Sequence, residues 1–296
     1  MKFSAYLYIN RGNYYGLPYR EAIESVLWCD EIFIGTDPRF DDGTLAQLKE
    51  LQTQYSNLHI VAAEFDYNQP NPHGAIKQQL RDMCDGDWLV ELDADEYLLQ
   101  NSIDGLKDLC ENAHPPVYAI EVPMLHFFNG NWLHQEMPPF RTLMSRNIKQ
   151  IRHDIGEVNY NGRYGAALIT NKELKVNAGL RYPQMTVYHY GWYSLPRKWE
   201  MKQTLHYYLG KQEGKYNSLD DYTKNLDNEE VNFWDLPWTL PIEHYIGAIH
   251  TEMHTEPLKR FRGKHPAIMS KWLAEQRVLP WRENIPSKLK NWLSFG

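Results

Sequence analysis

The sequence predicts an α/β fold in which a mainly parallel sheet is covered by helices. Two observations indicate this fold. Strand-like and helix-like stretches alternate through residues 3–92, and polar residues follow several of the predicted strands. Such alternation requires crossover connections, which build a parallel sheet that binds ligands at the carboxyl ends of its strands. We therefore expect functional residues at 10–11, 36–42 and 93–96.

Hydrophobic spacing predicts each element of this first half. Continuous apolar runs indicate buried strands, and apolar residues three and four apart indicate helices. Ala22, Ile23, Val26 and Leu27, for example, share one helical face. The expected elements, in chain order, are a strand at 3–9, a helix at 19–28, a strand at 31–35, a helix at 44–55, a strand at 58–62, a helix at 74–84 and a strand at 87–92.

The pattern changes after residue 115. Asn129-Gly130-Asn131 is a turn signal between strand-like stretches at 117–128 and from 132 onward, and residues 140–145 predict a further strand. Helical spacing dominates the last third of the chain, where we expect helices at 197–210, 242–254 and 266–276. We expect a first domain at 1–195, divided into halves at 1–114 and 115–195, and a helical C-terminal extension at 196–296.

Composition excludes several classes of protein. A chain of 296 residues, 43% hydrophobic and 23% charged, is neither disordered nor fibrous. Cys29, Cys84 and Cys110 form no CxxC pair, which disfavours a disulfide scaffold or a thiolate zinc site, predicts buried thiols and favours a reducing compartment. No stretch approaches the ~20 apolar residues of a membrane span. We expect a cytoplasmic protein.

Charge is distributed unevenly along the chain. The net charge is −7, which disfavours nucleic acid as a partner, yet residues 258–296 contain nine lysines and arginines against two glutamates. Trp272, Trp281 and Trp292 are interleaved with these cations. Such a segment predicts either a peripheral contact with the inner face of a membrane or a solvated helical surface.

Carboxylates cluster directly after the last predicted strand of the first half. The segment 86–96 reads GDWLVELDADE, so a buried strand is followed by Asp93, Asp95 and Glu96. Residues two apart on an extended segment share a face, so Asp93 and Asp95 point the same way. Two convergent carboxylates suit a hard cation, Mg²⁺ or Mn²⁺, whose other ligands are substrate phosphate oxygens.

These motifs together resemble the family 2 glycosyltransferases of the GT-A fold. The family typically carries an Asp followed five residues later by Asp-Gly-Thr, as in Asp37 and Asp42-Gly43-Thr44, and an Asn after the first strand, here Asn10. Members of the family commonly have an arginine ten residues before the Asp of the Gly-Asp-Trp motif, and in this chain that position is Lys77. Phe140-Arg141-Thr142 and His153-Asp154 are similar to a branch that builds bacterial lipopolysaccharide. The resemblance covers roughly residues 3–195.

The resemblance implies a metal-dependent, inverting transfer of a sugar from a nucleotide-diphosphate sugar to a hydroxyl of a glycan or lipid-linked acceptor. Residues 1–114 would bind the donor and residues 115–195 the acceptor. The implied donor-binding residues are Asn10, Asp37, Asp42, Lys77, Asp93 and Arg141. The implied metal ligands are Asp93, Asp95 and His189, with Mn²⁺ or Mg²⁺ as cofactor. Asp154 is the first candidate for the catalytic base, with Glu157 and Glu96 as rivals.

Other readings of these residues stay open. Asp154 also fits a hydrogen-bonded turn, and His189 a core histidine. His250 and His254 lack the order of a zinc protease motif and predict an ordinary helix face. The tryptophans at 132, 192, 199, 234 and 238 fit either sugar stacking or the core. One alternative function is a sugar nucleotidyltransferase, although Asn10-Arg11-Gly12-Asn13 is a poor substitute for the glycine-rich, basic loop that this class carries after its first strand. The other is a non-catalytic glycan-binding module.

Overall fold

A computed structural model describes residues 1–39, 42–66, 72–99, 101–115, 117–128, 130–134, 139–153, 169–170, 179–193 and 258–276. The chain divides into two compact units. Unit 1 consists of Met1–Leu125 and Pro138–His189, and unit 2 of His126–Met137 and Tyr190–Gly296. The predicted domain boundaries stay predictions, because residues 194–257 lie outside the described part. The predicted helices at 197–210 and 242–254, and with them His250 and His254, lie there too.

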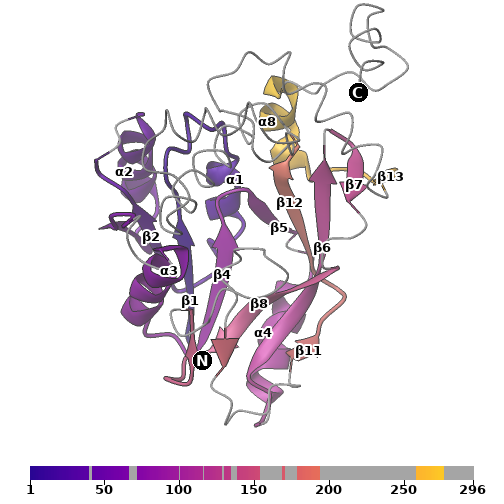
Figure 1. The fold of residues 1–296 in the computed structure, drawn as a ribbon. Coiled ribbons are helices and arrows are strands. Elements are labelled where there is room, and N and C mark those ends of the chain that lie inside the picture. Colours follow the sequence, from indigo (N-terminus) through magenta and orange to yellow (C-terminus); the bar gives the residue numbers. More distant parts are fainter. Residues whose placement is uncertain are drawn as a thin grey trace, which may run out of the picture. The chain divides into compact units, whose positions relative to one another are not determined.

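Unit 1 contains the predicted alternation of strands and helices (Figure 1). Its elements are β1 Phe3–Tyr8, α1 Tyr19–Glu24, β2 Glu31–Thr36, α2 Thr44–Gln54, β3 Leu58–Ala62, α3 Pro72–Met83, β4 Trp88–Asp93, β5 Glu96–Leu99, α4 Ile103–Asn112, β6 Ala119–Phe128, β8 Phe140–Arg146, β9 Ile151–Arg152, β10 Ile169–Thr170, β11 Gly179–Arg181 and β12 Thr186–Trp192. The last residues of β6 and of β12 belong to unit 2. β5 and α4 were not expected from the sequence. The predicted helix at 19–28 ends earlier, at Glu24, and continues as turns.

The sheet of unit 1 is parallel on one side and antiparallel on the other. β4, β1, β2 and β3 are neighbours in that order, and all three pairings are parallel. β8 pairs antiparallel with β4, and β6 pairs antiparallel with β8. The predicted α/β class, a mainly parallel sheet flanked by helices, is confirmed.

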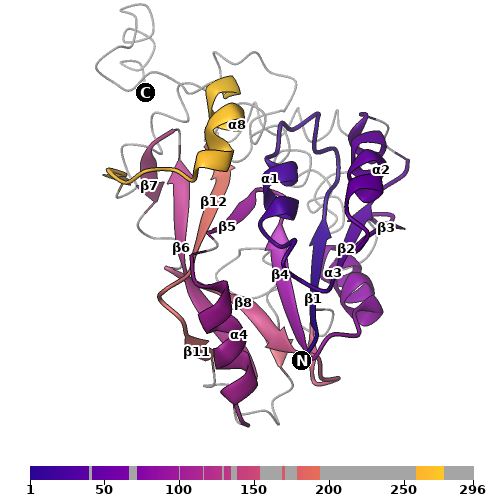
Figure 2. The same ribbon diagram turned by 180° about the vertical axis from the view of Figure 1, so that it is seen from behind.

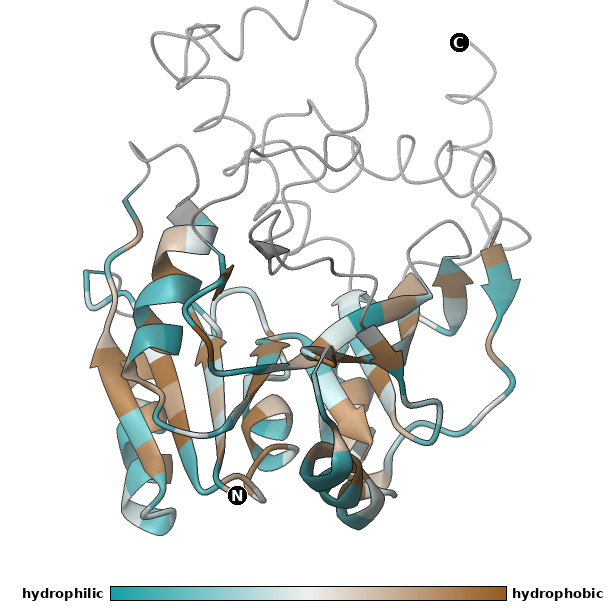
Figure 3. Cartoon of the chain, turned by 90° about the horizontal axis from the view of Figure 1, so that it is seen from below, coloured by the Kyte–Doolittle hydropathy of each residue, from teal (hydrophilic) through white to brown (hydrophobic). Residues whose placement is uncertain are grey.

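Two hydrophobic clusters cover opposite faces of this sheet because successive strand residues alternate between faces. Ala5 and Leu7 of β1 pack in a cluster with side chains of α1, α2 and α4. Tyr6, between them, packs in a second cluster with Ile76 and Leu80 of α3. Figure 2 shows the sheet from behind, and Figure 3 shows hydrophobic residues concentrated along its strands. The sheet is therefore buried on both faces, and its strand ends supply the accessible polar edge.

Unit 2 contains a short antiparallel segment and an aromatic cluster. β7 (Trp132–His134) pairs with the end of β6 and with β13 (Leu258–Arg260). The 3-10 helix η2 (Ala267–Met269) and helix α8 (Ser270–Glu275) follow within the predicted helix at 266–276. Aromatic contacts join Phe127, Tyr190, Tyr193, Phe261, His265 and Trp272. Trp192 is buried, as its interpretation as a core residue predicts, and Trp272 of the basic segment is buried as well.

Cys29, Cys84 and Cys110 are free and buried, as predicted. Among the described residues, no helix combines the length and hydrophobicity that a membrane crossing requires.

Candidate active site

The end of β4 and the start of β5 place three predicted carboxylates along one edge of the sheet. Asp93 is the last residue of β4, Asp95 lies in the following turn, and Glu96 opens β5. Their exposures differ sharply: the side chain of Asp93 is 47% exposed, that of Asp95 8% and that of Glu96 2%. Asp93 is therefore the carboxylate of this turn most accessible to a ligand.

Lys77 of α3 reaches this edge from one face of the sheet. Its Nζ lies 2.7 Å from Oδ1 of Asp93 and 2.6 Å from Oε1 of Glu91. Burial alone would lower the pKa of Lys77, but the charges of Asp93 and Glu91 outweigh it and raise that pKa above its usual value. Lys77 is therefore a buried ammonium ion at the predicted donor site.

Arg141 of β8 pairs with the carboxylate of Glu96 and donates from Nη2 to the Glu91 carbonyl oxygen, 3.1 Å away. Oε2 of Glu96 also accepts a hydrogen bond from the backbone N–H of Asp93, at 2.8 Å. The half-buried position of Asp93 opposes its ionisation, but the charges of Lys77 and Arg141 hold its pKa well below the usual range. Lys77 and Arg141, which were predicted from different motifs, thus both interact with Glu91 and both lower the pKa of Asp93.

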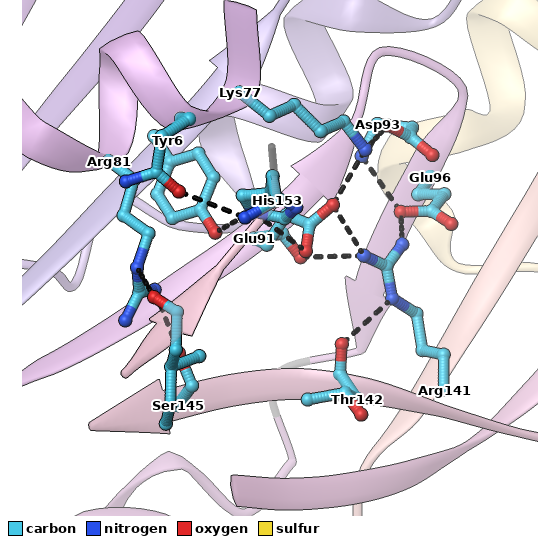
Figure 4. A network of polar contacts seen from close by, with 12 residues as sticks. Tyr6, Lys77, Arg81, Glu91, Asp93, Glu96, Arg141, Thr142, Ser145 and His153 are labelled. Carbon is cyan, nitrogen blue, oxygen red and sulfur yellow. Dashed lines mark hydrogen bonds and ion pairs between the residues drawn. The ribbon is translucent and has the colours of Figure 1, made fainter. Parts of the chain in front are cut away.

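Glu91 joins these groups and was missed in the sequence analysis. Its side chain is 5% exposed, and Oε2 lies 3.8 Å from Nε2 of His153, which also contacts the hydroxyl of Tyr6 at 2.7 Å. Figure 4 shows the Glu91 carboxylate between Lys77, His153 and Arg141. Burial would raise the pKa of Glu91, but the charges of Lys77, His153 and Arg141 lower it.

A signal for Glu91 was present in the sequence. It interrupts the otherwise apolar run Trp88-Leu89-Val90-Glu91-Leu92, in a strand expected to be buried. A buried carboxylate requires a charged or hydrogen-bonded partner, so a glutamate in such a strand predicts a buried cation nearby.

His189 lies near Asp95, the second of the three predicted metal ligands. β12 pairs antiparallel with β5 and places His189 opposite Glu96. Nε2 of His189 lies 3.7 Å from Oδ1 of Asp95. No group of three histidine, cysteine, aspartate or glutamate side chains in the described part of the chain has the arrangement of a metal site. The donor chemistry nevertheless fits a hard cation that takes one or two carboxylates from the protein and its remaining ligands from substrate phosphate.

The predicted donor residues of the first two loops have structural partners. The Asp37 side chain is fully buried; its oxygens accept hydrogen bonds from Nε and Nη2 of Arg39 and from the N–H of Phe65. Burial would raise the pKa of Asp37, but Arg39 and these N–H groups lower it. Asp42 accepts hydrogen bonds from the N–H groups of Tyr14 and Thr44, so it joins the two loops.

Asn10 differs from these residues. Its Oδ1 is buried and accepts no hydrogen bond from the described residues.

Asp154 and Glu157, two candidate bases, lie outside the described residues. His153, the last described residue before Asp154, donates from its backbone N–H to Oε1 of Gln78 at 2.9 Å.

No family model matches the chain, and no curated protein matches it significantly. Among solved structures, the crystal structure of S. aureus TarS 1-349 matches 84% of this chain and 80% of that chain, with 15% identity and a TM-score of 0.44. The same protein in complex with UDP-GlcNAc matches 87% and 82% of the two chains, with 15% identity and a TM-score of 0.43. Similarity at this level does not transfer a substrate or a residue's role.

Proposed function

We propose that the chain is a GT-A glycosyltransferase that moves a sugar from a nucleotide-diphosphate sugar to a hydroxyl of a glycan or lipid-linked acceptor. The observation that carries the proposal is the charged network at the ends of β4 and β5. Glu91, Asp93 and Glu96 contact two fixed cations, Lys77 and Arg141. Asp95 lies in the turn between Asp93 and Glu96, so four carboxylates and two cations form this network. The four carboxylates therefore carry two more negative charges than Lys77 and Arg141 neutralise, and one divalent cation would balance this excess.

In this proposal, Asp95, His189 and the exposed side of Asp93 hold Mg²⁺ or Mn²⁺. When bound, the ion would stabilise the charge that develops on the leaving diphosphate. Lys77 and Arg141 orient the carboxylates and keep them ionised. Asn10 would contribute its buried oxygen to donor binding, and Arg39, whose side chain is 45% exposed, would present the polar surface that covers Asp37.

An inverting displacement requires a group that removes the acceptor proton. Asp154 remains our first choice and Glu157 the second. Glu96 is less suited to this role, because Arg141 holds its carboxylate and the side chain is 2% exposed. A base must reach the acceptor hydroxyl, whereas the contacts of Glu96 explain it as a support of the β4–β5 turn.

The proposal includes an acceptor at a bacterial surface, such as lipopolysaccharide, and peripheral membrane contact through residues 258–296. Lys259, Arg260, Arg262 and Lys264 are exposed and available to anionic lipid, whereas Trp272 is buried. Removal of residues 285–296 is expected to weaken binding to anionic liposomes and to leave donor hydrolysis intact. Unchanged binding would favour a solvated surface.

The central experiment measures transfer and hydrolysis of a panel of nucleotide sugars with Mn²⁺. Asp95→Ala is expected to lose activity while remaining folded by circular dichroism. Asp108→Asn, which changes an exposed carboxylate of α4, is the matched control and should retain activity. Full activity of Asp95→Ala would contradict the metal assignment. Pyrophosphate release from a nucleoside triphosphate and a sugar phosphate would instead identify a nucleotidyltransferase, and glycan binding without nucleotide affinity a binding module.

A further inference from the structure

We propose that Lys77 is a resident cation that competes with the divalent metal ion for Asp93, so that the metal binds tightly only together with a nucleotide diphosphate. This inference rests on the proposed function, because it concerns the same metal site. It adds a reason for an order of binding, which neither the motifs nor the resemblance implies.

The first step of the argument is the position of the ammonium group. Nζ of Lys77 lies 2.7 Å from Oδ1 of Asp93, a distance at which a charge-assisted hydrogen bond forms. A metal ion that used this oxygen would have to share it with Lys77 or displace the ammonium group. Asp93 is 47% exposed, so an ion can approach the carboxylate from the solvent side.

The second step is that Lys77 cannot easily leave. Its side chain is 9% exposed, and Nζ also binds Oε1 of Glu91, whose own side chain is 5% exposed. Moving the ammonium group away would leave a buried carboxylate without its nearest cation, which is strongly unfavourable. Lys77 therefore stays near Asp93 when a metal ion arrives, and the two cations repel each other.

The third step concerns the diphosphate. Its oxygens carry negative charge and are preferred ligands of Mg²⁺ and Mn²⁺. Bound next to Asp93, the diphosphate would interact favourably with both the metal ion and the ammonium group of Lys77. Repulsion between the two cations would then be offset, and the metal and the nucleotide would each increase the affinity for the other.

The test compares Mn²⁺ binding, measured by electron paramagnetic resonance of free Mn²⁺, with and without UDP. Lys77→Met alone removes the cation nearest to the buried Glu91 carboxylate, so the main variant is Lys77→Met combined with Glu91→Gln, which preserves net charge. We expect this double variant to bind Mn²⁺ about tenfold more tightly than the unaltered protein when UDP is absent. With UDP present, the difference should shrink. Unchanged or weaker affinity without UDP would overturn the inference.

Two controls separate this inference from the proposed function. Lys107→Met removes a cation of α4 that lies over the ring of Trp28 and should leave Mn²⁺ affinity unchanged. Asp95→Ala tests the metal site itself in the presence of UDP. If Asp95→Ala and the unaltered protein bind Mn²⁺ equally, the proposed metal site is wrong. If only Asp95→Ala weakens binding and the double variant does not tighten it, the competition is wrong.

A second measurement uses the unaltered protein and does not depend on the folding of a variant. The ammonium signal of Lys77 can be observed by ¹⁵N nuclear magnetic resonance and assigned by its loss in Lys77→Arg. Addition of Mg²⁺ and UDP together is expected to shift this signal, and Mg²⁺ alone at the same concentration to shift it much less. An unchanged signal with both ligands bound would overturn the inference.

Discussion

Asp37, directly after β2, and Asp93, at the end of β4, each pair with a basic side chain, but the two pairs bury opposite partners. After β2, Asp37 is fully buried and Arg39 is 45% exposed. At the end of β4, Asp93 is 47% exposed and Lys77 is 9% exposed. The first pair therefore presents a guanidinium group to solvent and the second a carboxylate. The Asp37–Arg39 pair therefore stabilises its loop, whereas the Asp93–Lys77 pair forms part of a candidate ligand-binding site.

The origin of the partners explains this difference. Arg39 lies two residues after Asp37, so the pair forms within one loop and its cation remains at the surface. Lys77 comes from α3, which packs against the sheet and carries the ammonium group beneath the edge. Between Asp37 and Asp93, exposure distinguishes the carboxylate that a ligand can reach from solvent, which is Asp93. Four predictions test this comparison, from the largest expected effect to the smallest.

The largest effect is expected for Asp93→Asn. Loss of the exposed carboxylate should lower kcat/KM for the nucleotide sugar by about 10³-fold, equivalent to about 4 kcal/mol, with little change in the free energy of unfolding. Steady-state kinetics and urea unfolding measure the two quantities. Asp108→Asn serves as the control. Activity within tenfold of the unaltered protein would show that exposure of Asp93 has no functional meaning.

Asp37→Ala should act on stability instead. The substitution leaves the N–H of Phe65 without its acceptor and removes the partner of Arg39, so we expect a loss of about 2–3 kcal/mol in the free energy of unfolding. Urea unfolding measures it. An unchanged unfolding midpoint combined with a raised KM for the donor would make Asp37 a ligand-binding residue, against the comparison.

Arg39→Met should destabilise the protein by about 1–2 kcal/mol at pH 7, because it leaves the buried Asp37 carboxylate without its cation. The pKa of Asp37 is lowered in the folded state, so the stability that this carboxylate contributes is present above its unfolded pKa, about 3.9, and is lost as the pH falls through the folded pKa. The difference from the unaltered protein should therefore shrink between pH 7 and pH 3. A difference independent of pH would argue against this ion pair as the cause.

The smallest effect is expected at a pair exposed on both sides. Nη2 of Arg20 lies 3.7 Å from Oε2 of Glu50, and the two side chains are 44% and 63% exposed. Arg20→Gln should change the free energy of unfolding by less than about 0.5 kcal/mol. A loss as large as that of Arg39→Met would mean that burial of one partner does not set the strength of these pairs.

Much of the fold followed from local pattern. The apolar runs at 3–9, 31–35 and 58–62 predicted β1, β2 and β3 within one residue at either end, because a strand buried on both faces is apolar throughout. β5 and α4 were missed, and so was the early end of α1. These elements depend on the strands and loops against which they pack, such as β12 for β5, and this partner lies about 90 residues away in the sequence.

The candidate site was only partly predictable. Asp93 and Asp95 were selected by their position after a strand and Lys77 by the family resemblance, and the structure brings Lys77 and Asp93 into contact. Asp37 and Asp93 were both predicted to bind the donor, because both follow predicted strands. The sequence contains no signal that distinguishes the buried carboxylate from the exposed one. Their roles for ligands stay predictions, as does that of His189.

By itself, the sequence determined the alternation of strands and helices, the buried cysteines and the position of the carboxylates at a strand end, because these follow from hydrophobic spacing along the chain. Only the tertiary structure decided that Glu91 links Lys77, Arg141 and His153, and that Asp93 rather than Asp37 is exposed. The physical reason is that burial and ion pairing depend on which side chains meet in space. α3, β4 and β8 bring together charges that lie up to 64 residues apart in the chain.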